Sequence, residues 1–429
     1  MSKICIIGGG PSGISIARKL STSGIEYDLY EAGADFGGVW NANELCGRVY
    51  ESAHLISSKK ITQLMDFPMP ESYPHYPKHE LVLNYWREVA RSSGVYKHVR
   101  FNTAVKSVRK EQDGWRINTE NGHSEYYDFV IVCNGLQRIG RFPKLNFSDY
   151  TGEVLHSLDY KGSHQIAGKR VLVMGGGNSG CDIAVDCVHH STAVFHSTRR
   201  GYYYQPKFIN GMPTSDWMLS LGNKFESKEE GMAYIEQVFK LAGFDGTDFG
   251  LPKPDYPIQE AHPILNSQIL YYIGHGSIEP KPDISKLEGK IVQFEDGTET
   301  EIDLIICATG YDRDFSFLEK GLVDMKNGVP DFFLHMVPKS MDNLLFVGFI
   351  NSATGFGSFI ESSANFCVEY IHAIRSGKKG LQQFKEAKNE NIPDMGQRNF
   401  LDSYRHQWEV DLWKYLKEVN YYTDMLTNS

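Results

Sequence analysis

The sequence predicts an α/β fold that contains two similar strand–turn–helix units. The stretch KICIIGGGPSGISIA at residues 3–17 is an apolar run followed by three glycines and a helical pattern, and VLVMGGGNSGCDIA at residues 171–184 repeats this arrangement. A short apolar run that ends in a turn and continues into a helix is typical of a buried parallel strand and its crossover helix. The length of 429 residues also favours two domains over one.

The first unit is followed by elements that suit the same sheet. Gly24 ends the first helix, and Glu31 ends the next strand. Residues 34–77 are rich in Gly, Pro and Tyr, which predicts irregular structure. The elements expected in this part are strands at 4–7, 28–30, 99–109, 114–119 and 126–133, and helices at 12–20 and 79–94.

The second unit is followed by a long insertion and then by a return of sheet patterns. Residues 226–241 predict a helix, whereas residues 245–263 are rich in Gly, Pro and Asp and predict a loop. Strand patterns return at 291–294, 302–307 and 343–348, and a long helical pattern covers 359–375. We therefore expect a discontinuous first domain, residues 1–162 and 300–429, with a second domain inserted at 163–299 that carries an insertion at about 205–262.

The composition argues against several classes of function. A net charge of −9 is unfavourable for non-specific binding to nucleic acid or to an anionic membrane. The first strand pattern begins at residue 3, and no stretch approaches the roughly 18 apolar residues of a membrane span, so we expect neither a signal peptide nor a membrane anchor. Seven scattered cysteines without a CxxC pair predict buried free thiols in a cytoplasmic protein. His262 and His275 lack a usual ligand spacing, so no metal site is expected.

The first glycine cluster predicts a dinucleotide site. Gly8, Gly10 and Gly13 form a GxGxxG turn between a strand and a helix. Glycine lets the backbone approach a pyrophosphate there, and the helix N-terminus favours the negative charge. Glu31 follows 18 residues after Gly13 at the end of the next strand, where a carboxylate accepts both hydroxyl groups of an adenosine ribose.

The second glycine cluster predicts a different dinucleotide. Gly175, Gly177 and Gly180 form the turn, but the next strand ends without an acidic residue. Its end carries Ser197, Thr198, Arg199 and Arg200. A carboxylate would repel a 2′-phosphate, whereas arginine pairs with one, so this site is predicted to bind NADP(H). Two dinucleotide sites in one chain suggest a resident flavin and a hydride donor.

Four segments in the same order resemble the flavin-containing monooxygenases, which are class B single-component flavoproteins. They are GGGPSG with YEAGADFGGVW, YTGEVLHSLDYK at 150–161, GGGNSG with STRRG, and FEDGTETEIDLIICATGYD at 294–312. The second is similar to the family fingerprint F-x-G-x-x-x-H-x-x-x-[FY], with Tyr150, Gly152, His156 and Tyr160. A Tyr replaces the leading Phe, and we expect His156 to be a hydrogen-bonded structural residue.

The resemblance implies two Rossmann-like dinucleotide-binding domains, with the NADP domain inserted into a discontinuous FAD domain. The cofactors are FAD and NADPH, and the partners are O2 and a small-molecule substrate, with a homodimer as a possible assembly. The FAD-binding residues are expected to be Gly8, Gly10, Pro11, Ser12, Gly13, Glu31, Gly38, Val39, Trp40, Val105 and Asn351. The NADP-binding residues are expected to be Gly175, Gly177, Asn178, Ser179, Gly180, Ser197, Thr198, Arg199 and Arg200.

One segment departs from the family. The family carries an active-site Asn in a stretch resembling Y-x-x-L-x-x-N-x-P-K, and the corresponding stretch here is YESAHLISSKK at 50–60. Ile56 then takes the Asn position, and Ser58 takes the Pro position. Ser57, Ser58, Gln63 and Asn351 are candidates for the missing polar contact to the flavin.

The resemblance implies that NADPH reduces FAD and that O2 then forms a C4a-(hydro)peroxyflavin. A soft nucleophile, either an amine nitrogen or a thioether sulfur, attacks the distal oxygen of this species. A Baeyer–Villiger monooxygenase acting on ketones is an alternative, although its fingerprint usually ends in Trp, where this chain has Tyr160. An NADPH oxidase or redox sensor without a dedicated substrate is a third possibility, supported by Ile56 alone.

Overall fold

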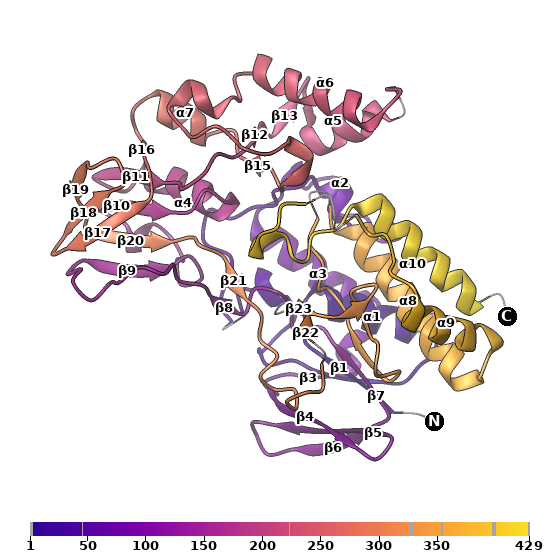
Figure 1. Ribbon diagram of the computed structural model, residues 1–429. Coiled ribbons are helices and arrows are strands. Elements are labelled where there is room, and N and C mark those ends of the chain that lie inside the picture. The colour runs from indigo at the N-terminus through magenta and orange to yellow at the C-terminus, as the bar shows by residue number, and fades with distance from the viewer. Residues whose placement is uncertain are drawn as a thin grey trace. The chain divides into compact units, whose positions relative to one another are not determined.

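A computed structural model describes residues 3–44, 46–222, 224–323, 325–326, 329–352, 355–396 and 400–427, and it shows an α/β protein (Figure 1). Contacts within the chain define two compact units, which we call unit 1 and unit 2. Unit 1 comprises residues 1–47, 59–138 and 313–429, and unit 2 comprises residues 48–58 and 139–312.

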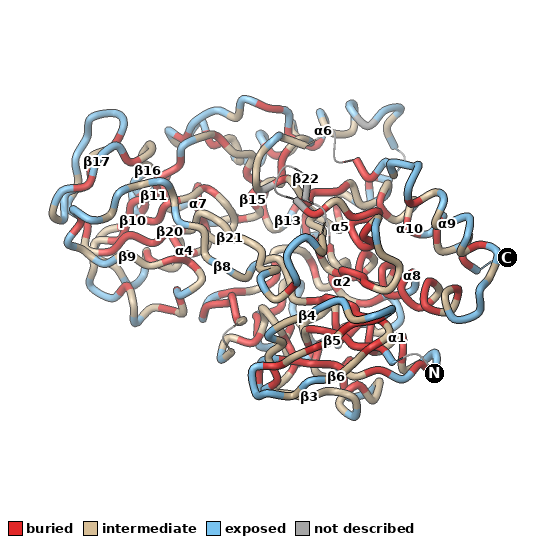
Figure 2. Tube along the Cα trace, turned by 60° about the horizontal axis from the view of Figure 1, so that its bottom comes forward, coloured by how far each residue is buried: buried red, intermediate tan, exposed pale blue. Residues whose placement is uncertain are grey.

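A parallel five-stranded sheet forms the centre of unit 1. Its strands in spatial order are β26 (Leu344–Phe346), β7 (Phe129–Val132), β1 (Ile4–Ile7), β2 (Asp28–Tyr30) and β3 (Val99–Arg100). In register, Ile7 lies between Val132 and Tyr30. All four residues of β1 are buried, as expected for a central strand with both faces covered. Figure 2 shows the buried residues of the chain in red and the exposed residues in pale blue.

Helices and a small antiparallel sheet complete unit 1. Helix α1 (Pro11–Thr22) packs against α3 (His79–Ser92) and α8 (Gly357–Ser376), and α8 packs against α10 (Leu412–Thr427). Helix α9 (Lys379–Glu390) also contacts α8 and α10. The sheet of β4 (Val105–Glu111), β5 (Gly114–Thr119) and β6 (Ser124–Tyr127) joins the core through Val108, Trp115 and Tyr127, which cluster with Cys5 and Ile7.

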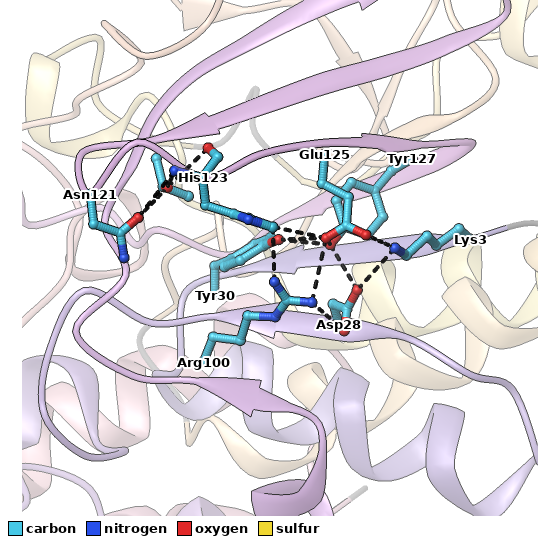
Figure 3. A network of polar contacts seen from close by, with 9 residues as sticks. Lys3, Asp28, Tyr30, Arg100, Asn121, His123, Glu125 and Tyr127 are labelled. Carbon is cyan, nitrogen blue, oxygen red and sulfur yellow. Dashed lines mark hydrogen bonds and ion pairs between the residues drawn. The ribbon is translucent and has the colours of Figure 1, made fainter.

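A polar network fastens the small sheet to the parallel sheet of unit 1. Figure 3 shows Glu125 between Lys3 and His123, with Asp28 and Arg100 below it. Glu125 accepts a hydrogen bond from Lys3 and lies 2.9 Å from His123 Nε2. Burial alone would raise the pKa of Glu125, but the hydrogen bonds from Lys3 and His123 hold it at about 2. The network therefore stabilises the contact between the two sheets.

A second parallel five-stranded sheet forms the centre of unit 2. Its strands in spatial order are β16 (Glu279–Lys281), β11 (Ala193–Ser197), β10 (Arg170–Met174), β20 (Leu304–Cys307) and β9 (Glu153–His156). Helix α4 (Asn178–Cys187) follows β10 and packs against β10 and β11. An antiparallel sheet of β17 (Ile284–Glu288), β18 (Ile291–Phe294) and β19 (Glu299–Glu301) adds to the same core.

The insertion of unit 2 has a small core of its own. Helices α5 (Thr214–Leu221) and α6 (Lys228–Leu241) bury Trp217, Ile235 and Phe239 with Ile209 and Ile258. The insertion is joined to the rest of unit 2 by β12 (Tyr204–Gln205) and β15 (Ile264–Leu265), which pair in parallel. Ser227 caps α6 by accepting a hydrogen bond from the backbone N–H of Glu230, which agrees with the helix expected at 226–241.

The structure also shows where the expected element ranges differ. Strands β9 and β20 belong to the second sheet although they lie outside residues 163–299, because β20 pairs with β10 and β9 pairs with β20. The strand pattern at 99–109 is divided into β3 and β4, since Asn102 adopts a positive φ of 52° between them. Residues 48–58 join unit 2 rather than the surrounding chain of unit 1.

Three further observations concern the described residues. None of their helices is both long and apolar enough to cross a membrane. No group of three or more His, Cys, Asp or Glu side chains in this part of the chain is placed to hold a metal ion. All seven cysteines are free thiols, and six of them are buried.

Candidate functional site

The first glycine turn of unit 1 brings β1 and α1 into very close contact. Gly8 has a φ of 106°, and a Cβ added at Gly13 would lie 1.8 Å from the carbonyl oxygen of Gly8. Only glycine fits both positions. Helix α1 begins at Pro11, and no side chain caps its N-terminus. The first-turn N–H groups are therefore available to an anionic ligand.

Glu31 lies against this turn, as the sequence predicts. Its two carboxylate oxygens accept hydrogen bonds from the backbone N–H groups of Gly9, at 2.5 Å, and of Gly33, at 2.7 Å. Burial raises the pKa of Glu31, and these two hydrogen bonds oppose that rise. The carboxylate is thus fixed beside the turn, with lone pairs left to accept from ribose hydroxyl groups.

Segments from three other parts of unit 1 meet at the turn. A Cβ at Gly38 would lie 2.8 Å from the Cα of Gly10, which places the segment Gly38–Trp40 directly beside the turn. A Cβ at Gly348 would lie 2.2 Å from the Oγ of Ser12. Asn134, which follows β7, has a buried Oδ1 without a hydrogen-bond partner among the described residues, while its Nδ2 donates to Asp314. A narrow backbone cradle with an unsatisfied acceptor fits a bound dinucleotide such as FAD.

Two expected FAD-binding residues have other neighbours. Val105 begins β4 and packs against the core between the two sheets of unit 1. Asn351 follows β26, and its Nδ2 donates a hydrogen bond of 2.6 Å to Glu409. The backbone of Asn351 also pairs with that of Trp408 and Val410. One N–H of its amide is therefore committed to the C-terminal part of unit 1.

The candidates for the polar contact to the flavin are also engaged. Ser58 is buried, and its hydroxyl donates to Asp216 in the insertion of unit 2 at 2.5 Å. Gln63 belongs to unit 1, and its Oε1 accepts a hydrogen bond from the backbone N–H of Met69 at 2.9 Å. Ser57 is half-buried and belongs, with Ser58, to unit 2. The structure therefore assigns these candidates to separate units.

The second glycine turn repeats the geometry of the first within unit 2. Gly175 has a φ of 115°, and a Cβ at Gly180 would lie 1.8 Å from the carbonyl oxygen of Gly175. Helix α4 begins at Asn178 and has no side-chain cap. The Oδ1 of Asn178 accepts from the backbone N–H of Leu265, which fixes β15 beside the start of the helix. The geometry fits a second dinucleotide.

The end of β11 carries the residues expected at a 2′-phosphate. Ser197 and Thr198 are buried, and the hydroxyl of Ser197 donates to the carbonyl of Pro282 at 2.7 Å. Arg199 is exposed. The guanidinium of Arg200 lies over the ring of Tyr256, 5.8 Å from its centroid. Two cations thus follow the strand, and an aromatic ring supports one of them.

The fingerprint residues are structural contacts inside unit 2. His156 accepts a hydrogen bond at Nδ1 from the backbone N–H of Leu158, and its Nε2 donates to the carbonyl of Gly310 at 3.1 Å. Burial lowers the pKa of His156, consistent with a neutral ring. Tyr160 donates to Asp186 on α4 at 2.5 Å, and Tyr150 donates to the carbonyl of Ile302. The fingerprint therefore holds β9 and its flanking turns in place.

Sequence reasoning missed a polar cluster one helical turn beyond Asn178. Asp182 accepts hydrogen bonds from Asn266 at 2.6 Å and from Tyr50 at 3.3 Å. Burial raises the pKa of Asp182 and lowers the pKa of Lys207 to about 8. The charge of each group opposes the pKa shift of the other. Asp182, which lies in α4 between the buried Cys181 and Ile183, was the available signal, but its partners come from distant segments.

Sequence and structure comparisons give one consistent result. A family model described as flavin-binding monooxygenase-like matches residues 1–428. The chain is 30% identical over 443 residues to flavin-containing monooxygenase 5 from Cavia porcellus, covering 97% of this chain and 82% of that protein. It is 32% identical over 441 residues to flavin-containing monooxygenase 2 from Homo sapiens, covering 93% and 81%.

Solved structures share the fold. S-allyl-L-cysteine S-oxygenase from Allium sativum superposes with a TM-score of 0.65 at 19% identity, covering 100% of this chain and 88% of that one. Cyclohexanone monooxygenase from Rhodococcus sp. Phi1, bound to NADP+, superposes with a TM-score of 0.73 at 18% identity, covering 100% and 97%.

Proposed function

The chain belongs to the flavin-binding monooxygenase-like family, and from this premise we propose that it is an NADPH- and O2-dependent monooxygenase that oxygenates an amine nitrogen or a thioether sulfur. The observation that carries the proposal is the pair of glycine turns with different strand ends. One turn is followed by Glu31, and the other by Arg199 and Arg200. The first suits the free ribose of FAD, and the second suits the 2′-phosphate of NADPH.

Unit 1 is proposed to hold FAD. The N–H groups at the start of α1 face the pyrophosphate, and Glu31 accepts from the adenosine ribose. The segment from Gly38 to Trp40 and the buried Oδ1 of Asn134 supply further contacts. These residues would hold and orient FAD, which when bound would supply electron transfer from NADPH and activation of O2. Asn351 donates one N–H of its amide to Glu409, so its Oδ1 and its second N–H are proposed to serve a ligand.

Unit 2 is proposed to hold NADPH. The first turn of α4, from Asn178 to Gly180, binds the pyrophosphate, and Arg199 and Arg200 bind the 2′-phosphate. Thr198 presents no carboxylate that would repel this phosphate. The remaining expected contacts are Gly175, Gly177, Ser179 and Ser197.

We further propose the domain arrangement that the sequence suggests, with the NADP domain inserted into a discontinuous FAD domain. The proposal is supported by the chain order, because unit 2 takes residues 139–312 from the middle of unit 1. Free, buried thiols fit a reducing compartment, so a cytoplasmic location is proposed as well. A homodimer is a further proposal, which the mass of the protein in solution tests.

The test is a comparison of products under one set of conditions. The purified FAD-containing protein is mixed with NADPH, O2 and, separately, a tertiary amine, a thioether or cyclohexanone. We expect one equivalent of N-oxide or S-oxide for each NADPH consumed. Lactone from cyclohexanone would instead assign Baeyer–Villiger activity. Consumption of NADPH that yields only hydrogen peroxide with all three substrates would refute the monooxygenase proposal and favour an oxidase.

A further inference from the structure

The two glycine turns differ in how their first peptide group is held. Parallel pairing gives the correspondence, because Ile7 lies opposite Tyr30 and Met174 lies opposite Ser197. The strand-end residue Glu31 of unit 1 therefore corresponds to Thr198 of unit 2. One position before the paired residue, Leu29 of β2 corresponds to His196 of β11.

In the first turn, the peptide between Gly8 and Gly9 is held from its N–H side. The Gly9 N–H donates to the carboxylate of Glu31 at 2.5 Å. Leu29, which is fully buried, has no polar group to offer the carbonyl of the same peptide. The acid that accepts from ribose therefore also orients the first peptide of the turn.

In the second turn, the corresponding peptide is held from its carbonyl side. His196 is fully buried on β11, and its Nε2 lies 3.0 Å from the carbonyl oxygen of Gly175. A carbonyl can only accept, so the hydrogen lies on Nε2. Burial lowers the pKa of His196, which keeps the ring neutral. Its Nδ1 has no hydrogen-bond partner among the described residues.

The direction of the Gly175 carbonyl also sets the direction of the next N–H group. In a trans peptide the C=O and the N–H point to opposite sides of the same plane. The Gly175 carbonyl points into the core toward His196, so the Gly176 N–H points away from His196. None of the hydrogen bonds between described residues uses this N–H. The peptide is thus oriented without occupying its donor.

We propose that His196 is a positioning residue of the second nucleotide site, which holds the Gly175–Gly176 peptide so that the Gly176 N–H faces the end of β11 and the 2′-phosphate of NADP(H), as the Gly9 N–H faces Glu31 in the first turn. The inference rests on the proposed function of unit 2. The end of β11 has no carboxylate, which would repel a 2′-phosphate. In its place, His196 orients the first peptide of the turn. This role also gives a reason for a buried histidine with an unsatisfied nitrogen, a feature that costs stability.

The test compares variants that differ in the hydrogen-bond donor. His196→Leu removes the donor and copies Leu29 of the first turn, whereas His196→Gln places an amide N–H near the position of Nε2. The dissociation constant for NADP+ is measured by calorimetry on the FAD-containing protein. We expect His196→Leu to weaken NADP+ binding by about three- to tenfold, the effect of one hydrogen bond, and His196→Gln to stay within about twofold of the original protein.

Two further measurements separate positioning from general damage. Adenosine 2′-phosphate carries the phosphate that this N–H faces, so its affinity should fall with that of NADP+ in His196→Leu and recover in His196→Gln. Val194→Ala removes buried volume from the same face of β11, so it should lower the melting temperature and leave NADP+ affinity unchanged. If His196→Leu does not fold, His196→Asn takes its place, because the shorter side chain keeps polarity but does not reach Gly175.

The outcomes are distinct. An unchanged NADP+ affinity in the variants without a donor overturns the role of His196, as does an unchanged affinity for adenosine 2′-phosphate. If the original protein does not bind NADP+, the proposed function of unit 2 fails instead. Weaker NADP+ binding with FAD retained and with rescue by His196→Gln supports the inference.

Discussion

Replacement of Arg200 by Gln should separate the two forms of the reduced nicotinamide cofactor. Arg200 lies over the ring of Tyr256, and that ring is fixed because the Tyr256 hydroxyl donates to the carbonyl of Gly201 at 3.0 Å. A supported guanidinium loses less conformational freedom when it binds phosphate. We therefore expect Arg200 to contribute more than the exposed Arg199 to the recognition of a 2′-phosphate.

The expected magnitude follows from the type of interaction. A hydrogen bond to a charged group contributes about 1.5–3 kcal/mol, which corresponds to roughly 10- to 150-fold in affinity. Arg200→Gln should lower kcat/KM for NADPH within this range and leave kcat/KM for NADH within about twofold. Arg199→Gln should have a smaller effect, because exposed ionic contacts are screened by solvent and salt. Tyr256→Leu should weaken NADPH binding by about two- to fivefold, because the guanidinium of Arg200 loses the support of the ring.

The assay is the anaerobic reduction of the bound flavin, followed by absorbance over a range of NADPH and NADH concentrations. Working without O2 isolates cofactor binding and flavin reduction from the oxygenation of substrate. The reasoning is refuted if Arg200→Gln slows flavin reduction by NADH and by NADPH equally, since the arginine would then not discriminate by the 2′-phosphate. It is also refuted if Arg199→Gln has the larger effect.

Four other single substitutions test the cradles and the core. Gly13→Ala should yield protein without FAD, as measured by flavin absorbance. Gly180→Ala should keep FAD and bind NADP+ at least about tenfold more weakly, as measured by calorimetry. In both variants the added Cβ would lie 1.8 Å from a backbone oxygen. Glu125→Gln should lower the free energy of unfolding by about 1–2 kcal/mol at pH 7. Because folding lowers the pKa of Glu125 to about 2, its stabilising effect is present above the unfolded pKa and is lost as the pH falls toward 2, so denaturant unfolding should show the smaller difference at pH 3. Asn351→Ala should lower the free energy of unfolding by about 1–3 kcal/mol, because it deprives the buried carboxylate of Glu409 of a donor. Addition of Glu409→Leu should restore part of this loss. Strictly additive effects in the double variant would argue against this pairing.

The sequence predicted the parts of the molecule that depend on local chemistry. The two glycine turns could be identified because a strand, a turn without Cβ atoms and a helix follow one another within about 20 residues. The contrast between Glu31 and Arg200 is equally local, since each follows the strand that comes after its turn. The position of both glycine turns in the fold follows from these short-range patterns.

The parts that the sequence could not predict depend on distant partners. Ser58 was a candidate for a flavin contact, but its hydroxyl donates to Asp216, more than 150 residues along the chain. Asn351 lies 58 residues from Glu409, which takes its amide nitrogen. Asp182 likewise accepts its hydrogen bonds from Tyr50 and from Asn266, which follows β15. Periodicity gives no information about such pairs, because each depends on how separate elements pack.

The comparison between the two turns shows how the residue at the strand end affects both the choice of cofactor and the backbone of the turn. In unit 1, Glu31 accepts from the turn and is placed to accept from a ribose, so a single carboxylate serves both the backbone and the ligand. A 2′-phosphate requires that carboxylate to be absent, and its absence also removes the acceptor for the first peptide of the turn. In unit 2 that peptide is instead held by His196 through its carbonyl, two positions before Thr198. An acid introduced at Thr198 would accept from the Gly176 N–H on the other side of this peptide, so it is compatible with the hydrogen bond from His196, and this single change should move the preference toward NADH.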